Sequence, residues 1–198
     1  MSSTSADAGK SIVIHGHISA TPELFAGIFG ARSTGESDLG ADCAIFAINP
    51  SAGIDPSTIE LWNSYDDVQM PRLVVVTVLE GMELDFDDAV MVGNRVFDNL
   101  VTPYLVLHGE NGTPIGTISL HDLSTVDYST TPPTHGKADH ELAELVEDFR
   151  SEFQEQTNEF GEGSFAAGLI FPAIPVNPAN QLGIEIVKSY LSQLPSRD

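Results

Sequence analysis

Hydrophobic residues gather in four short runs that alternate with stretches of helical periodicity. The runs lie near Ile12, Cys43, Leu73 and Leu169. Each run is short and almost unbroken, as expected of a strand that is covered on both faces. Strands of this kind that alternate with helices are typical of an α/β domain with a mainly parallel sheet. We therefore predict such a sheet from these four runs.

The clearest unit lies between Ala41 and Val78. It is predicted to contain a strand at 43–48, a turn at 49–53, a helix at about 57–68 and a strand at 73–78. Asp55 followed by Pro56 is typical of a helix N-cap with proline in the first helical position. Two parallel strands joined by one helix form a right-handed βαβ crossover. Trp62 on that helix is expected to be at least partly buried against the sheet.

The remaining elements are predicted from the same signals. An Asn-Gly turn between two apolar runs indicates a hairpin, and a region rich in Thr and Pro indicates a loop. The predicted elements are a first strand at 11–14, helices at 23–29, 87–97, 139–160 and 182–194, a hairpin at 101–120, a loop at 125–136 and a last strand at 168–176.

The helix predicted at 139–160 carries apolar residues at helical spacing opposite an acidic face. These residues are Leu142, Leu145, Val146, Phe149 and Phe153. Core packing is the main interpretation of this stripe. The alternative is a face that binds a partner protein.

The charge of the chain limits its partners. The net charge is −21, from 8 Lys and Arg against 29 Asp and Glu. Nucleic acids and anionic membranes require a basic surface, so neither is expected as a direct partner. A length of 198 residues favours one domain, preceded by a disordered tail at 1–10. The sequence shows no hydrophobic segment of membrane-spanning length, which makes a cytoplasmic location the default expectation.

Candidate metal sites are weak. His15 and His17 have the spacing that places two residues on one face of a strand, but no third ligand is near them in the sequence. The acidic segment 80–88 contains the carboxylates that Mg²⁺ or Ca²⁺ prefers, yet it lacks the ligand spacing and glycine of a calcium loop. A solvated turn that initiates a helix is the preferred interpretation. Cys43 lies in an apolar run and is expected to be a core residue.

Two segments resemble the GTPase domain of elongation factor G. They are 41–76, ADCAIFAINPSAGIDPSTIELWNSYDDVQMPRLVVV, and 183–196, GIEIVKSYLSQLPS. The resemblance extends over about 12–196 and implies a P-loop GTPase-like three-layer fold. The hairpin insert would occupy about 101–136. Only a polar loop lies between Gly30 and Gly40, so two strands and both switch regions of the family are expected to be missing.

The resemblance also marks the positions where the family binds nucleotide, and here they have changed. A Gly-Lys pair is absent from the first turn, no Asp-x-x-Gly motif is present, and Thr-Val-Leu-Glu replaces the base-reading Asn-Lys-x-Asp. An Asn-Pro turn replaces the family's Ser-Ala turn. The matching positions, expected to be inactive, are Gly16, His17, Ser19, Thr21, Thr77, Glu80 and Asn177.

The sequence therefore predicts a pseudo-GTPase domain that serves as a protein-interaction or structural module. No catalytic residue, metal or cofactor is expected. The alternative is a non-standard GTP-binding protein or GTPase linked to translation, with GTP and Mg²⁺ as cofactors. Loss of the neighbouring strands would make Ile12–Ile14 a sheet edge. The N-terminal tail, the loop at 31–39, or a strand from a protein partner or a second copy could cover it, and pairing with another chain is the favoured alternative. Association with the ribosome is an open question at this point.

Overall fold

The computed structural model describes residues 9–78, 86–161 and 163–195. The predicted tail at 1–10 and the acidic segment at 80–88 lie mostly outside these residues. The helices and strands are β1 (Ile12–His15), the 3₁₀ helix η1 (Ile18–Ala20), α1 (Pro22–Phe29), β2 (Arg32–Ser33), β3 (Cys43–Ile48), α2 (Pro56–Asn63), β4 (Arg72–Thr77), α3 (Phe86–Gly93), β5 (Leu100–Val101), β6 (Tyr104–His108), β7 (Pro114–Ser119), β8 (Ser124–Asp127), β9 (Thr134–Lys137), α4 (His140–Leu145), α5 (Glu147–Asn158), β10 (Phe171–Val176) and α6 (Ile184–Ser192).

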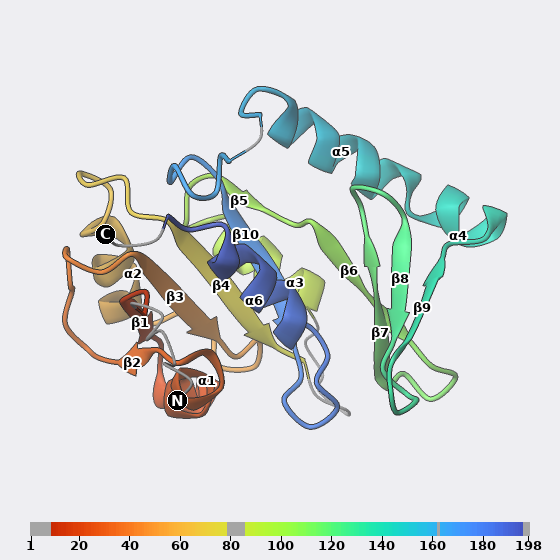
Figure 1. The fold of residues 1–198 in the computed structure, drawn as a ribbon, viewed down its shortest axis with the longest axis horizontal. Coiled ribbons are helices and arrows are strands. Elements are labelled where there is room, and N and C mark those ends of the chain that lie inside the picture. The colour runs from red at the N-terminus through yellow and green to blue at the C-terminus, as the bar shows by residue number, and fades with distance from the viewer. Residues whose placement is uncertain (1–8, 79–85, 162, 196–198) are drawn as a thin grey trace, which may run out of the picture.

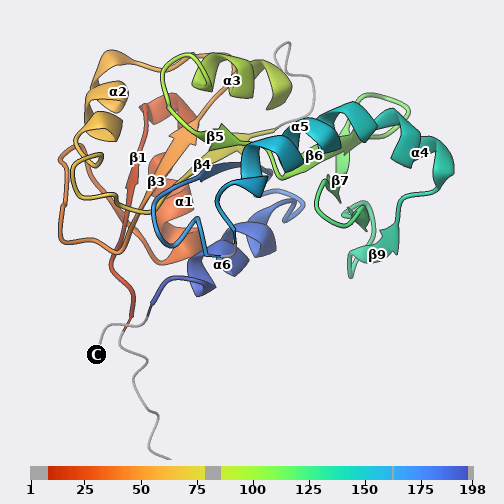
Figure 2. The ribbon, with the colours of Figure 1, turned by 90° about the horizontal axis from the view of Figure 1, so that it is seen from above.

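A parallel sheet of six strands, in the order β2-β1-β3-β4-β10-β5, forms the centre of the fold. Helices α1 and α6 cover one face, and α2 and α3 cover the other (Figures 1 and 2). The inner four strands are those predicted from the hydrophobic runs, and a two-residue strand is added at each edge. The predicted three-layer α/β fold is confirmed.

Successive residues of β3 supply the two faces of this sheet. Cys43 and Ile45 belong to the core beneath α1 and α6, whereas Ala44 and Phe46 belong to the core beneath α2. Because both faces are buried, the strand contains no polar residue between its ends. Burial raises the pKa of the Cys43 thiol, which agrees with its predicted role as a core residue.

The helix between β3 and β4 begins as predicted and ends early. The Asp55 carboxylate accepts from the Thr58 N–H at 3.0 Å, and Pro56 occupies the first turn. The helix ends at Asn63, before the predicted end at Val68. At this end Arg72 donates to the carbonyl of Trp62 at 2.7 Å, which satisfies an acceptor of the last turn.

Trp62 lies at the centre of an aromatic cluster on this face. Its ring stacks on Phe97 with 4.1 Å between centroids and meets Phe171 edge-on at 5.1 Å. The guanidinium of Arg72 lies 4.5 Å from the Trp62 ring and 4.2 Å from the Phe171 ring. Asp66 pairs with the same guanidinium at 2.7 Å. The charge of Arg72 is therefore buried with partners on several sides.

The insert is larger than the predicted hairpin. β6 and β7 form that hairpin, and β8 and β9 extend it into an antiparallel sheet of four strands. The prediction of a loop at 125–136 was therefore wrong for 125–127 and 134–136, which are strand, and right for 128–133 between them. β9 is exposed along its length and β8 is half-buried, so neither needs the apolar alternation by which a strand is recognised in a sequence.

The helix predicted at 139–160 is divided into α4 and α5 at Val146 (Figure 1). Asp139 caps α4 by accepting from the Leu142 N–H at 2.9 Å. Val146 turns into the small core of the insert with Ile118. The bend leaves Leu145 75% exposed and Phe149 48% exposed, so the core packing predicted for these two residues was wrong.

The first strand is not a sheet edge. Val13 pairs with Arg32 and Ile14 pairs with Ser33, so β2 covers the side of β1 away from β3. The loop at 31–39, one of the caps considered, covers this edge, and the favoured pairing of Ile12–Ile14 with another chain was wrong. Backbone pairing of two polar residues in the shortened loop was sufficient to close the sheet.

The other helix boundaries differ slightly from the prediction, with α3 starting at Phe86 and ending at Gly93 and α6 ending at Ser192. In the part of the chain that the structure describes, no helix combines the length and apolar character needed to cross a membrane.

Replacement of Trp62 tests the importance of the aromatic cluster. Trp62 is 1% exposed, so Trp62→Ala should lower the free energy of unfolding by about 3–5 kcal/mol, measured by urea denaturation. Trp62→Phe, which keeps a stacking ring, should cost clearly less. A loss under about 0.5 kcal/mol for the alanine variant, within the range of ordinary surface substitutions, would show that the helix does not dock as described.

Candidate functional site

The structure brings most of the marked positions to one edge of the sheet. In a parallel sheet the carboxyl ends of the strands meet at one edge, where open α/β folds bind their ligands. Gly16 follows β1, Thr77 ends β4, and Asn177 follows β10. Thr77 pairs directly with Val176, whereas β3 separates β1 from β4. Glu80 lies outside the described residues.

The turn after β1 uses its own amide groups. The Ser19 N–H donates to the His17 ring at 3.2 Å. The Ala20 N–H donates to the His17 carbonyl at 2.9 Å, and the Thr21 N–H donates to the Ile18 carbonyl at 3.1 Å. Pro22 has no N–H to offer. A phosphate cradle needs amides that converge on the ligand, and here three successive amides are satisfied within the turn.

The hollow between this turn and the loop after β3 is small. Asn49, from the loop after β3, donates its side-chain amide to the Ser19 carbonyl at 3.0 Å. The cavity that remains between the two loops has a volume of about 10 Å³, which is about the space that one water molecule requires. A Cβ atom on Gly16 would lie 2.5 Å from the Ala47 carbonyl oxygen, so this turn is also packed tightly against β3.

The charge near the turn is unfavourable for an anion. Asp55 lines the same small cavity as His17 and Ser19. Burial alone would raise the pKa of Asp55, but hydrogen bonds from Ser57 and Thr58 outweigh it and hold the pKa below its ordinary value. The carboxylate therefore stays ionised at neutral pH. A phosphate placed at this turn would be repelled by it.

Lys10, the nearest lysine in sequence, has another role. Its ammonium donates to the carbonyls of Leu191 at 2.8 Å and Ser192 at 3.2 Å. These are C-terminal carbonyls of α6, where a cation is favoured by the helix dipole. Lys10 therefore joins the start of the described chain to the last helix.

The turn after β10 holds the insert. Asn177 accepts from the Ala179 N–H at 3.0 Å and closes the turn on itself. Asn180 accepts from the Leu182 N–H at 3.1 Å and donates to the carbonyl of Pro114, at the start of β7, at 3.2 Å. The region that would match the family's Ser-Ala turn therefore anchors the antiparallel sheet.

Thr77 differs from these satisfied positions. It is 8% exposed, and its hydroxyl is buried without a hydrogen-bond partner among the residues that the structure describes. A buried hydroxyl without a partner is costly. Thr77 thus places a buried polar group, without a partner among the described residues, at the carboxyl end of β4.

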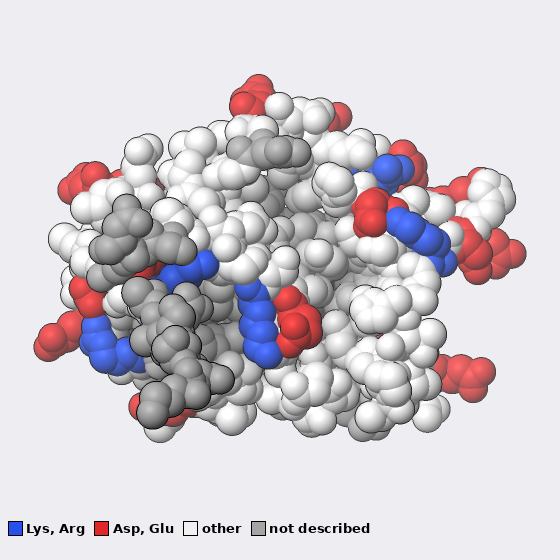
Figure 3. Space-filling view, in the orientation of Figure 1, with Lys and Arg blue, Asp and Glu red and all other residues white. Residues whose placement is uncertain are grey.

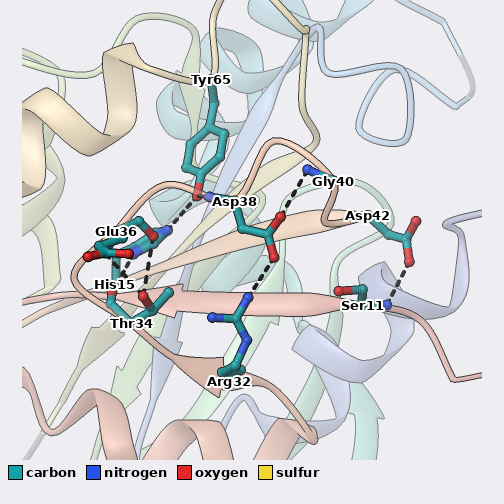
Figure 4. A network of polar contacts seen from close by, with 9 residues as sticks. All are labelled: Ser11, His15, Arg32, Thr34, Glu36, Asp38, Gly40, Asp42 and Tyr65. Atoms are coloured by element: carbon teal, nitrogen blue, oxygen red, sulfur yellow. Dashed lines mark hydrogen bonds and ion pairs between the residues drawn. The ribbon is translucent and has the colours of Figure 1, made fainter.

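A network that could not be predicted from the sequence fixes the loop between α1 and β3 (Figure 4). His15 is 1% exposed, and its Nδ1–H donates to the Thr34 carbonyl at 2.7 Å. Its Nε2 accepts from the Tyr65 hydroxyl at 2.7 Å, and that hydroxyl oxygen accepts from the Asp38 N–H at 3.0 Å. Arg32 pairs with Asp38 on the outer side. The sequence signal that could have pointed to this network is His15, a histidine at the end of an apolar run.

Metal binding at the two histidines is not supported by their geometry. His15 is committed to Thr34 and Tyr65, and the His17 ring contacts Ser19. Within residues 9–78, 86–161 and 163–195, no three His, Cys, Asp or Glu side chains are grouped so that they could hold a metal ion.

Comparison with known proteins supports the resemblance to the elongation factor G family. No family model matches the chain. Two curated relatives, the elongation factor G-like proteins of two Mycobacterium tuberculosis strains, are each 28% identical over 178 residues. The chain resembles the GTPase domain of elongation factor G. The match covers 79% of this chain and 25% of each relative, so the chain spans about a quarter of their length.

A solved structure shows the same fold. The crystal structure of a Thermus thermophilus protein superposes with a TM-score of 0.71 over 96% of this chain and 41% of that chain, at 18% identity. The chain thus has a P-loop GTPase-like fold, with the short strand β2 between α1 and β3.

The His15 network makes the stability of the fold depend on pH. Burial lowers the pKa of His15 below its ordinary value near 6.5, and the bond to Thr34 only partly opposes this. The neutral ring is therefore the folded form. Its stabilising contribution is complete above pH 6.5 and is lost as the pH falls from there toward the lowered pKa. His15→Gln should reduce the pH dependence of unfolding between pH 7 and 5.

Urea titrations of both proteins across that range check this prediction. The other titrating groups are the same in both, so the difference between the two curves isolates His15. Parallel curves would contradict the assignment of a neutral, hydrogen-bonded His15.

Proposed function

We propose that this chain is a pseudo-GTPase: a domain with the elongation factor G-like fold that binds proteins rather than guanine nucleotide. The observation that carries the proposal is the closed turn after β1. Ser19, Ala20 and Thr21 use their amides inside the turn, and Pro22 supplies none.

The electrostatics support the same conclusion. Phosphoryl transfer depends on positioning and on cations that neutralise the developing charge. Here Asp55 is the ionised group beside the turn, and Lys10 is engaged at the end of α6. The residues present do not fit a magnesium–nucleotide complex in the family's manner, so no catalytic step is derived from them.

The overall charge favours protein partners. A net charge of −21 repels nucleic acid and anionic lipid. Because β2 closes the edge of the sheet beside β1, a partner would use another surface. The proposed role is therefore that of an interaction or structural module, in which the GTPase scaffold is retained and its ligand site is closed.

One observation favours a second function, nucleotide binding through non-standard contacts. The buried hydroxyl of Thr77 lies at the position where the family reads the base, and it has no partner among the described residues. A base that reached this buried hydroxyl would satisfy it. A single hydroxyl leaves the phosphates without any contact, so this remains the weaker candidate.

Calorimetric titration with GTP and GDP in the presence of Mg²⁺ separates the two functions. The proposed function predicts no binding at micromolar concentration and no release of phosphate. A ligand at about 100 times its Kd would stabilise the fold by about 2.7 kcal/mol, so a thermal-shift series gives an independent reading. Micromolar affinity that is lost in Thr77→Val would establish the second function instead.

A further inference from the structure

A cleft opens between α6 and the insert. Its walls come from the start of β6, the end of β7 and the turn that follows, α5 and α6. Figure 1 shows α6 in front of the parallel sheet, with the strands of the insert beside it. The volume of the cleft is about 350 Å³, at the lower end of the range for small-molecule sites. The turn after β1 contributes no residue to it, so the cleft is separate from the closed nucleotide position.

Aromatic rings from three elements line this cleft. They are Tyr104 of β6, Phe153 of α5 and Tyr190 of α6. The Tyr190 ring also meets Phe165 edge-on, with 5.2 Å between ring centroids, and this contact holds its orientation. Aromatic side chains provide flat apolar surface, against which the C–H groups of a ligand ring can pack.

Two phenol groups in the cleft are available to a ligand. Burial raises the pKa of Tyr190, and the nearby Tyr104 adds to this effect. Burial also raises the pKa of Tyr104, with a smaller contribution from Asp122. Both phenols therefore keep their protons at neutral pH. In the part of the chain that the structure describes, neither hydroxyl has a hydrogen-bond partner, so two O–H donors are left in one hollow.

Asp122 provides a fixed acceptor at the same place. Its carboxylate accepts from the Lys137 ammonium at 2.8 Å, from the Ser124 hydroxyl at 2.7 Å and from the Ser124 N–H at 3.1 Å. Hydrogen bonds from Lys137 first, and then from Ser124, hold the pKa of Asp122 below its usual range. The carboxylate is therefore ionised and held in one orientation, and it can accept further hydrogen bonds.

The charges around the cleft are balanced locally, although the whole chain is strongly acidic. Asp122 is paired with Lys137, and Glu185 on α6 is paired with Lys188 at 2.8 Å. Figure 3 shows this face of the molecule: the surface between α6 and the insert is largely uncharged, and blue and red side chains lie against each other at its margins. A ligand in the cleft therefore needs no net charge.

We propose that this cleft binds an uncharged, polyhydroxylated small molecule of the size of a single sugar ring. The aromatic faces would cover the C–H side of the ring, while Asp122 and the two phenols would bond to its hydroxyl groups. This inference goes beyond the proposed function and does not depend on it, because the cleft does not include the turn after β1.

Other classes of ligand fit the cleft less well. An anion would meet the ionised carboxylate of Asp122, and an organic cation would compete with Lys137 for the same group. An apolar ligand would leave the phenol O–H groups without partners, which is costly when water is excluded.

Nuclear magnetic resonance with saturation transfer tests the proposal on the full chain. The probes are D-glucose, D-galactose, D-mannose, D-ribose and myo-inositol, each at millimolar concentration. At least one of them should receive saturation from the protein, and its Kd is then measured from the ¹⁵N shifts of amides in the cleft. Because the ligand is uncharged, the Kd should be the same at about 50 mM and about 500 mM salt.

Two variants locate the binding in the cleft. Tyr190→Phe keeps the ring and removes one donor, so it should weaken binding about fivefold. Asp122→Ala removes the charged acceptor and should weaken binding about tenfold or more. Glu185→Ala is the matched control: it breaks the other ion pair and changes the net charge equally, but Glu185 does not line the cleft. Its Kd should equal that of the wild type, and circular dichroism checks that each variant is folded.

Binding of none of these probes would overturn the proposal, and so would a Kd that is the same in the wild type, Tyr190→Phe and Asp122→Ala. Inorganic phosphate and methylammonium are titrated in parallel. Tighter binding of either ion than of the neutral probes, with an affinity that falls as salt rises, would assign the cleft to an ion and would also overturn the proposal.

Discussion

The burial of β3 between two layers of helices is the constraint on which the rest of the structure depends. Its residues alternate between the two cores, and its neighbours β1 and β4 pair with it in parallel along almost their whole length. The close packing of Gly16 on Ala47 extends this constraint to the turn after β1. The turn therefore lies where a GTPase fold places it, whether or not it can hold a phosphate.

Scaffold and ligand site can diverge because different chemistry maintains them. The scaffold needs apolar strands, a capped helix and aromatic packing around Trp62, all of which are present. The ligand site needs amides and cations that are left free for a ligand. In this chain they are used for internal bonds: the turn amides within η1, Lys10 at the end of α6, and Asn180 against the insert.

The features that were predictable from the sequence are those specified by local patterns. Asp55-Pro56 marks a helix start through a single cap, and the runs at 43–48 and 73–78 mark strands through continuous burial. β2 and β9 carry no such pattern, because these strands are held by backbone pairing, of β2 with β1 and of β9 with β8, and not by buried apolar side chains. The same holds for the His15 network, whose partners Thr34 and Tyr65 are brought together only by the tertiary fold.

The exposure of Leu145 and Phe149 could not be predicted from the helical spacing of apolar residues either. The bend at Val146 changes the direction in which each side chain points. A helix stripe identifies apolar residues and does not say whether the fold or a partner buries them. At the marked nucleotide positions, the residue changes in the first turn were visible in the sequence. The closure of that turn by its own amides was visible only in the structure.

The most direct test of the closed site follows the amides of the first turn by nuclear magnetic resonance. Mg²⁺ and GTP are titrated into ¹⁵N-labelled protein while the Ser19, Ala20 and Thr21 resonances are recorded. Their N–H groups already have partners within the turn. The account therefore predicts that the chemical shifts of these three amides do not change as nucleotide is added. Saturable shifts at these three amides would show that the turn opens to cradle a phosphate and would contradict the account.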